Sequence, residues 1–365
     1  MSERQSGRLL RWIAAMLVVV FCAIGAGAEA PKGQIIEREI QSKSFAENKI
    51  GTNPVRKVVV YLPAAYNESA GRFPVMYFLA SPFDRSFRAI FDDNRAEAVF
   101  DRAIDDGAIG KFIVVCPDMT TPLGSSWYVN SPVTGNWEDF LVKELVPYID
   151  ANFRTMASRD SRGIIGVFMG GYGAIRFAMK YPEVFGSVYG LHPVGTGSGL
   201  KIMLALPNWT ILENAKTLSD VRADGYSTIF TGIFQAFLPN VHKPPLYIDL
   251  AAHKNGDDLV IDSKLAGRVR DNFFLESLIP QYAENMKSLR GFRFDWARSD
   301  PNQDHVYSNQ AFTHKLNEFG IAHEAEEYNG TWGEQYWGEE GRISTEVLPF
   351  FQRHLVFERN DNGRR

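Results

Sequence analysis

Four side chains capable of acid–base chemistry follow two expected strands of the chain. His192 comes directly after one strand, and Asp300, Asp304 and His305 come shortly after another. A carboxylate beside an imidazole is a general acid–base pair, which can activate water or remove a proton next to a carbonyl group. We therefore take these four as the candidate catalytic residues. Either aspartate with either histidine would form the pair.

A glycine-rich turn between an apolar strand and a helix is the most informative segment. Residues 163–167 are Gly-Ile-Ile-Gly-Val, and Gly170 and Gly171 follow at the start of the helix. In the G-x-S-x-G turn, this arrangement exposes a nucleophilic serine at the apex. The apex here is Phe168, which has no nucleophilic atom, so acyl-enzyme chemistry at this position is excluded.

Further motifs lie before and after this turn in the sequence. They are Asn130–Phe140, Glu144–Asp150, Met169–Ala174 with Tyr181–Phe185, Glu327–Gly330 and Val347–Phe351. Together they resemble the esterase family of α/β hydrolases, the group that contains esterase D, feruloyl esterases and mycolyltransferases. The resemblance covers roughly residues 55–358, and it implies a carboxylic ester hydrolase or acyltransferase scaffold.

The resemblance implies a catalytic order of serine, acid and histidine, of which this chain keeps the acid. Asp300 matches the acid position, with Asp304 as the second choice, while Phe168 and Trp332 stand at the serine and histidine positions. The family's His-Gly after the third strand is also replaced, here by Ala-Ser-Pro at residues 80–82. Backbone N–H groups of Phe83 and Met169 would still supply an oxyanion hole, because such donors do not depend on the side chain.

Two functional hypotheses remain open. The first is an exported pseudoenzyme with a degenerate triad that is not a serine hydrolase and binds a carbohydrate, aromatic or acyl ligand, or a partner protein. The second is an active enzyme on acyl or carbonyl substrates that uses relocated groups among Asp300, Asp304, His305 and His192. An Asp–His contact inside a crevice would favour the second.

Aromatic residues concentrate in loops expected to surround the crevice. Phe83, Trp127, Tyr128, Phe168, Trp332, Tyr336 and Trp337 form this group. A flat aromatic wall suits sugar rings or phenolic ligands, so Trp127, Tyr128, Tyr336 and Trp337 are candidate ligand-binding residues. Alternatively, Phe168 and Trp332 fill the vacated site as a plug.

No cofactor or metal is expected from the motifs. The acid clusters Asp92-Asp93-Asn94 and Asp257-Asp258 lack accompanying His or Cys at metal-binding spacing and are typical of turns. Neither a dinucleotide-binding glycine motif after a strand nor a Walker sequence is present.

Strands and helices alternate through most of the chain, which predicts an α/β fold with a mostly parallel central sheet and helices on both faces. The expected strands are 35–42, 56–62, 75–79, 112–116, 163–166, 187–191, 292–297 and 322–328. The expected helices are 95–105, 137–153, 172–181, 307–319 and 343–354. The first two strands should pair antiparallel at an edge. Residues 193–286 interrupt the alternation after the sixth strand and form either a cap over a ligand crevice or a stabilising decoration.

The N-terminal residues 1–28 have the pattern of a signal peptide. Three arginines precede an apolar run from Trp12 to Ile24, and Ala26-Gly27-Ala28 offers a cleavage site. We expect a single α/β-hydrolase domain at 29–358, a tail at 359–365, and a periplasmic or extracellular location. The run falls short of the roughly 20 apolar residues that span a bilayer, so we expect no stable membrane span after cleavage.

Composition limits the partners. The 365-residue chain is 45% hydrophobic, which is enough for a large core, and its formal net charge is −4. Without a basic excess, nucleic acid is not an expected partner. A small-molecule ligand is the expected one.

Overall fold

The computed structural model describes residues 32–82 and 86–357. The expected signal peptide 1–28, the tail 359–365 and Phe83 lie outside the described residues. Within the described ranges, no helix is both long and apolar enough to cross a membrane.

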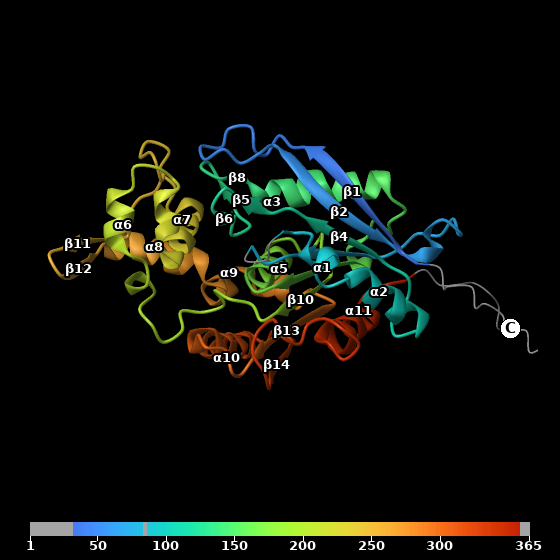
Figure 1. The fold of residues 1–365 in the computed structure, drawn as a ribbon. Coiled ribbons are helices and arrows are strands. Elements are labelled where there is room, and N and C mark those ends of the chain that lie inside the picture. The colour runs from blue at the N-terminus through green and yellow to red at the C-terminus, as the bar shows by residue number, and fades with distance from the viewer. Residues whose placement is uncertain (1–31, 83–85, 358–365) are drawn as a thin grey trace, which may run out of the picture. The chain divides into compact units, whose positions relative to one another are not determined.

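One eight-stranded sheet organises the described chain (Figure 1). Its strands, in spatial order, are β1 (Gln34–Gln41), β2 (Val55–Leu62), β4 (Ile113–Pro117), β3 (Val75–Leu79), β9 (Arg162–Val167), β10 (Ser187–Leu191), β13 (Gly291–Ala297) and β14 (Glu324–Tyr328). β1 pairs antiparallel with β2, and β2 pairs antiparallel with β4, while the pairs from β4 to β14 are parallel. The predicted mostly parallel sheet and its antiparallel edge are therefore confirmed.

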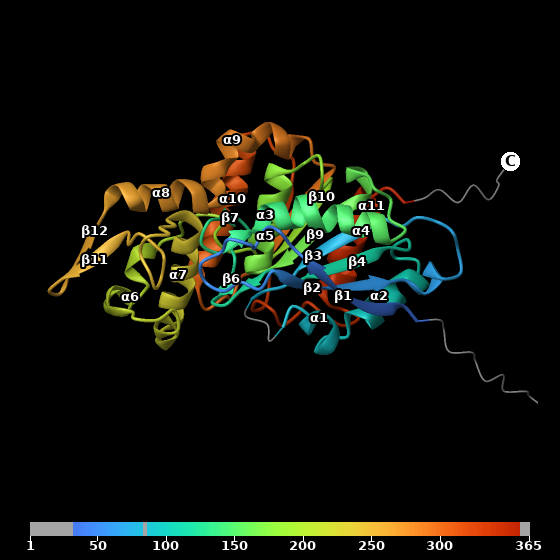
Figure 2. The same cartoon turned by 90° about the horizontal axis from the view of Figure 1, so that it is seen from above.

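Helices cover both faces of this sheet (Figure 2). Gly166 lies against α5 (Met169–Lys180), because a Cβ added at Gly166 would meet that helix. Gly163 lies against α11 (Leu348–His354), because a Cβ added at Gly163 would meet Phe351 of that helix. Side chains three positions apart in a strand point to opposite faces, so α5 and α11 lie on opposite sides of β9. Phe312 of α10 (Gln303–Glu318) packs on Phe294 on the α5 side.

The remaining helices of the main layers are α1 (Ala89–Asp92), α2 (Ala96–Asp105), α3 (Trp137–Asp139) and α4 (Val146–Asn152). The helix predicted over 137–153 is interrupted by a π-helical stretch, Phe140–Leu145. The helix predicted over 343–354 begins with another π-helical stretch, Ile343–Val347. Each stretch lies just before a proline, Pro147 or Pro349. Because proline has no N–H, the regular hydrogen-bond ladder loses a donor there, and a wider turn replaces it.

The segment 193–286 folds mainly as helices beside the carboxyl ends of β9 and β10. It contains α6 (Trp209–Asn214), α7 (Gly225–Phe237), the hairpin of β11 (Ala252–Asn255) and β12 (Asp258–Ile261), α8 (Ser263–Phe273) and α9 (Leu275–Lys287). Two small hairpins precede α3, formed by β5 (Thr120–Thr121) with β6 (Gly124–Ser125) and by β7 (Asn130–Ser131) with β8 (Gly135–Asn136). Of these elements, α7 and α8 supply residues that line the pocket described below.

Candidate functional site

Phe168 lies at a sharp turn between β9 and α5. Its backbone has φ 56° and ψ −112°, a conformation that L-residues rarely adopt, and its N–H donates to the carbonyl of Leu191 at 2.9 Å. A Cβ at Gly166 would lie 1.9 Å from the carbonyl oxygen of Gly170, and one at Gly170 would lie 2.0 Å from that of Leu79. The close-packed, strained strand-to-helix turn is thus intact around a phenylalanine.

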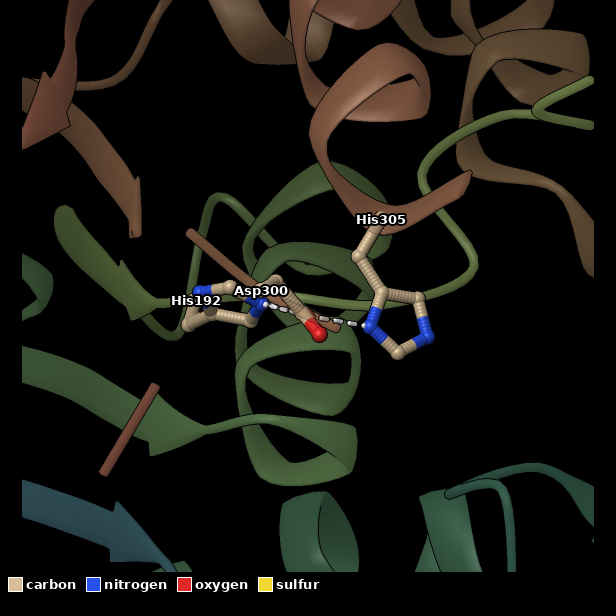
Figure 3. Close-up of side chains that lie close together, drawn as sticks. All are labelled: His192, Asp300 and His305. Carbon is tan, nitrogen blue, oxygen red and sulfur yellow. Dashed lines mark hydrogen bonds and ion pairs between the residues drawn. The ribbon is translucent and has the colours of Figure 1, made fainter. Parts of the chain in front are cut away.

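Asp300 joins two histidines beside this turn (Figure 3). Its Oδ2 atom lies 2.7 Å from Nε2 of His192 and 2.7 Å from Nδ1 of His305, and its Oδ1 accepts the N–H of Asn302 at 2.7 Å. His192 comes from the end of β10, and His305 from the first turn of α10. His192 and Asp300 are buried, whereas His305 keeps 20% of its side chain exposed.

These contacts hold Asp300 in its ionised form. Burial of the carboxyl opposes ionisation, but the hydrogen bonds from His192, His305 and the Asn302 backbone outweigh it and lower the pKa of Asp300 below its usual range. Nδ1 of His192 accepts the N–H of Ala297 at 3.0 Å. A neutral His192 must therefore carry its proton on Nε2 and donate it to Asp300.

The proton on Nε2 of His192 also affects metal binding. Ligand atoms of His192, Asp300 and His305 lie within 4.8 Å of one another, a cluster of the kind that holds transition metals. Nε2 of His192, however, has no free lone pair while Nδ1 accepts the N–H of Ala297. The cluster fits a carboxylate that holds two imidazoles better than it fits a metal.

Phe168 forms the middle of an aromatic stack. Its ring lies 4.6 Å from that of Trp332 at an interplanar angle of 22°, and 6.0 Å from that of His192 at 18°. The His305 ring meets it edge-on at 5.2 Å. Phe168 is 7% exposed and Trp332 37% exposed, so Trp332 covers Phe168 and presents surface to solvent.

A cavity of about 610 Å³ opens next to this stack. Phe168, Trp332 and His305 line it, and so do residues of the 193–286 segment, among them Ile229, Phe230 and Phe273. Phe168 and Trp332 therefore line a pocket and do not fill it completely. An apolar cavity with a few polar groups is typical of a small-molecule site.

The remaining candidate residues differ in their position relative to the pocket. Trp127, Met169 and Asp304 line the pocket. Oδ1 of Asp304 accepts the N–H groups of Leu200 and Lys201. Asp304 therefore does not form the acid–base pair with His305 that the sequence allowed. As the first residue of α5, Met169 has an N–H without a partner inside the helix, as an oxyanion donor requires. The second expected donor, Phe83, lies outside the described residues.

Three expected ligand-binding aromatics lie elsewhere. Tyr128 is buried against Gly173 and donates to the carbonyl of Ala80 at 3.2 Å. Trp337 packs against Phe78 at 5.9 Å, and Tyr336 is 3% exposed. None of the three lines the 610 Å³ cavity. Loop position in the sequence did not distinguish an aromatic facing the crevice from one completing the core.

Sequence reasoning missed Asn302. Its Nδ2 atom lies 2.9 Å from Nε2 of His305, and its backbone N–H is the third donor to Asp300. The one indication in the sequence was that Asn302 lies between the candidate residues Asp300 and His305. Asn302 therefore holds both members of the Asp300–His305 pair.

A buried ion pair, Arg342–Asp295, lies next to His192. Arg342 Nε donates to Oδ2 of Asp295 at 2.8 Å, and the Tyr189 hydroxyl donates to the same oxygen at 2.8 Å. The carbonyl of Asp295 accepts the N–H of His192 at 2.8 Å. This pair fixes the end of β13 next to His192, and its members were not recognised from the sequence.

The sheet order, the strained turn after β9 and the acid after β13 together define an α/β-hydrolase fold. The family described as "Putative esterase" matches residues 51–216. The match confirms the resemblance to the esterase family over this part of the chain.

An esterase of Mycobacterium tuberculosis is 39% identical over 150 residues, which are 39% of this chain and 30% of the relative. The chain thus spans less than a third of that relative's length. Among solved structures, a ferulic acid esterase is 17% identical with a TM-score of 0.58, covering 89% of this chain and 99% of that one. An S-formylglutathione hydrolase from Agrobacterium tumefaciens is 16% identical with a TM-score of 0.58, covering 90% and 98%.

Proposed function

We propose that this protein is an exported, non-hydrolysing relative of the esterases that binds a small molecule with a carbohydrate, aromatic or acyl part. The observation that carries the proposal is Phe168 on the intact turn, beside an apolar cavity of about 610 Å³. A phenylalanine cannot attack a carbonyl carbon, yet the space beside it is retained. Export rests on the N-terminal sequence pattern alone.

The cavity surface favours an aromatic ligand. Aromatic residues line the cavity, among them Phe168, Phe230, Phe273 and Trp332. Stacked and edge-on contacts with such rings contribute beyond simple burial of area. A ferulic acid esterase has the same fold, and we take ferulic acid as the first probe on that basis.

Binding is tested by calorimetric titration of the protein with ferulic acid. Ile229→Trp would fill the cavity and should lower the affinity at least about tenfold. Ile261→Trp, on exposed β12, is the matched control and should leave the affinity unchanged. Equal affinities for both variants would contradict binding in this cavity.

Loss of serine chemistry is tested with p-nitrophenyl, feruloyl and acetyl-sugar esters. We expect no turnover in the parent and in Trp332→His, and turnover in Phe168→Ser combined with Trp332→His. Turnover in the parent that disappears in Asp300→Asn or His305→Ala would overturn the proposal.

A second candidate function has one specific observation in its favour. Nδ1 of His305 lies 2.7 Å from Asp300, the arrangement in which a carboxylate orients a general base, and His305 lines the cavity. In this mechanism Nε2 takes a proton from water, the oxygen attacks the ester carbonyl carbon, and the proton passes to the departing alkoxide as the carbon–oxygen bond breaks. The Asn302 amide would first have to leave Nε2.

A further inference from the structure

A glycine-rich loop follows β10 beside the 610 Å³ cavity. Residues 195–199 are Gly-Thr-Gly-Ser-Gly, and φ is 66° at Gly195 and 63° at Gly199. Glycine adopts this left-handed conformation without strain and leaves the backbone freer than other residues do. Three residues of the 197–202 loop line the cavity: Gly197, Ser198 and Lys201. The loop thus borders the proposed ligand site with a backbone that can change conformation.

Two side-chain carboxylates hold this loop. The N–H of Ser198 donates to Oε1 of Glu276 at 3.1 Å. The N–H groups of Leu200 and Lys201 donate to Oδ1 of Asp304 at 2.9 Å and 3.1 Å. Within the described part of the chain, no backbone–backbone hydrogen bond reaches this part of the loop. The three bonds lie at exposed positions where water competes for each partner, so the loop is held less firmly than a strand or a helix.

The two most exposed large apolar side chains of the described chain lie on the same loop. Leu200 is 72% exposed and Ile202 is 69% exposed, and neither lines the cavity. Tyr226 and Trp332, which do line the cavity, are 42% and 37% exposed. Apolar surface that gathers around a pocket indicates a binding surface, and its removal from water is favourable in proportion to the area covered.

From these observations we infer that residues 197–202 form a lid that closes over a ligand in the cavity and brings Leu200 and Ile202 into contact with it. The inference rests on the proposed function. The glycines supply the hinge at one end of the lid. At the other end Leu204 is buried and its carbonyl accepts the indole N–H of Trp209 at 2.7 Å, so the movement ends before Leu204. A bound ligand favours the closed conformation because it gives the two apolar side chains a surface on which to pack.

Substitution of the two apolar residues distinguishes a closing lid from a static loop. If the loop keeps its present position, neither side chain lines the cavity, and Leu200→Ser and Ile202→Ser leave the affinity for ferulic acid unchanged. If the loop closes, each substitution should weaken the binding of ferulic acid by the full-length protein about tenfold in calorimetric titrations. The loss should arise mainly from faster dissociation in stopped-flow measurements, because the contacts form after the ligand has entered.

Ile261→Ser on β12 is the matched control. Ile261 is also exposed and lies outside the cavity lining, so this substitution should change neither the affinity nor the dissociation rate. All three side chains are exposed, and an unchanged thermal unfolding temperature in each variant shows that a weaker affinity does not come from misfolding. An unchanged affinity in both Leu200→Ser and Ile202→Ser would overturn the inference and leave the proposed function intact. Failure of the parent to bind ferulic acid would overturn both.

Discussion

Nδ1 of His305 lies 2.7 Å from Oδ2 of Asp300, whereas the resemblance in the sequence predicts Trp332 at the position of the esterase family's histidine. The imidazole reaches the acid from the first turn of α10, not from the loop after β14. An acid–histidine contact thus exists here beside a turn whose apex is Phe168.

The hydrogen bonds to Asp300 should make a measurable, pH-dependent contribution to stability. Asp300→Asn removes the charge and leaves poorly matched donors, so we expect a loss of about 1.5–3 kcal/mol in the free energy of unfolding at pH 7. Because the folded-state pKa of Asp300 is lowered, this stabilisation is present above the unfolded-state value near about 3.9 and is lost as the pH falls towards the folded-state value.

Urea denaturation at several pH values between neutral and acid checks this expectation. The difference between the parent and Asp300→Asn should shrink below about pH 4. Asp304→Asn is the control, because its oxygen can still accept the N–H groups of Leu200 and Lys201. A difference that grows as the pH falls would contradict the assignment.

Replacement of the turn glycines should be severely destabilising. Gly166→Ala and Gly170→Ala place a Cβ 1.9 Å and 2.0 Å from backbone carbonyl oxygens, and backbone must shift to relieve either contact. We expect each to cost more than about 3 kcal/mol, in the upper range of single substitutions. Gly267→Ala in α8, which meets only Arg270 at 3.9 Å, should instead stabilise by about 0.5–1 kcal/mol. Thermal unfolding of the three variants distinguishes these outcomes.

The strain at Phe168 should reverse the usual order of alanine and glycine. In ordinary backbone, glycine is less stable than alanine by about 0.5–1 kcal/mol. At φ 56° and ψ −112° the conformational strain of a non-glycine residue is about 1–3 kcal/mol. Phe168→Gly should therefore be at least as stable as Phe168→Ala in chemical denaturation. A clearly less stable glycine variant would show that the strain is not present in solution.

The tautomer of His192 is directly observable. Because Nδ1 accepts the Ala297 N–H, the ring should carry its proton on Nε2 near neutral pH. Long-range ¹⁵N–¹H correlation spectra of labelled protein report this assignment, and Asp300→Asn should shift the Nε2 resonance. A proton found on Nδ1 would mean that the Ala297 contact does not form.

Much of the scaffold was predictable because it depends on local patterning. Apolar runs marked all eight strands of the main sheet to within a few residues, and the alternation with helices gave the parallel arrangement. The main error was the start of α10, expected at Tyr307 and found at Gln303. That difference moves His305 from a loop into a helix turn. Local propensity did not reveal it, because the preceding residues are polar and their helical form is supported by contacts with Asp300.

The sequence alone determined that Phe168 occupies the apex of a glycine-lined turn and that serine chemistry there is excluded, since both follow from residue type and local spacing. Only the tertiary structure decided which histidines meet Asp300. His192 and Asp300 are 108 residues apart in the chain, and they meet because β10 and β13 pair in parallel, with Leu191 opposite Asp295. Strand register is set by long-range packing and hydrogen bonding, so contacts that depend on it cannot be read from neighbouring residues.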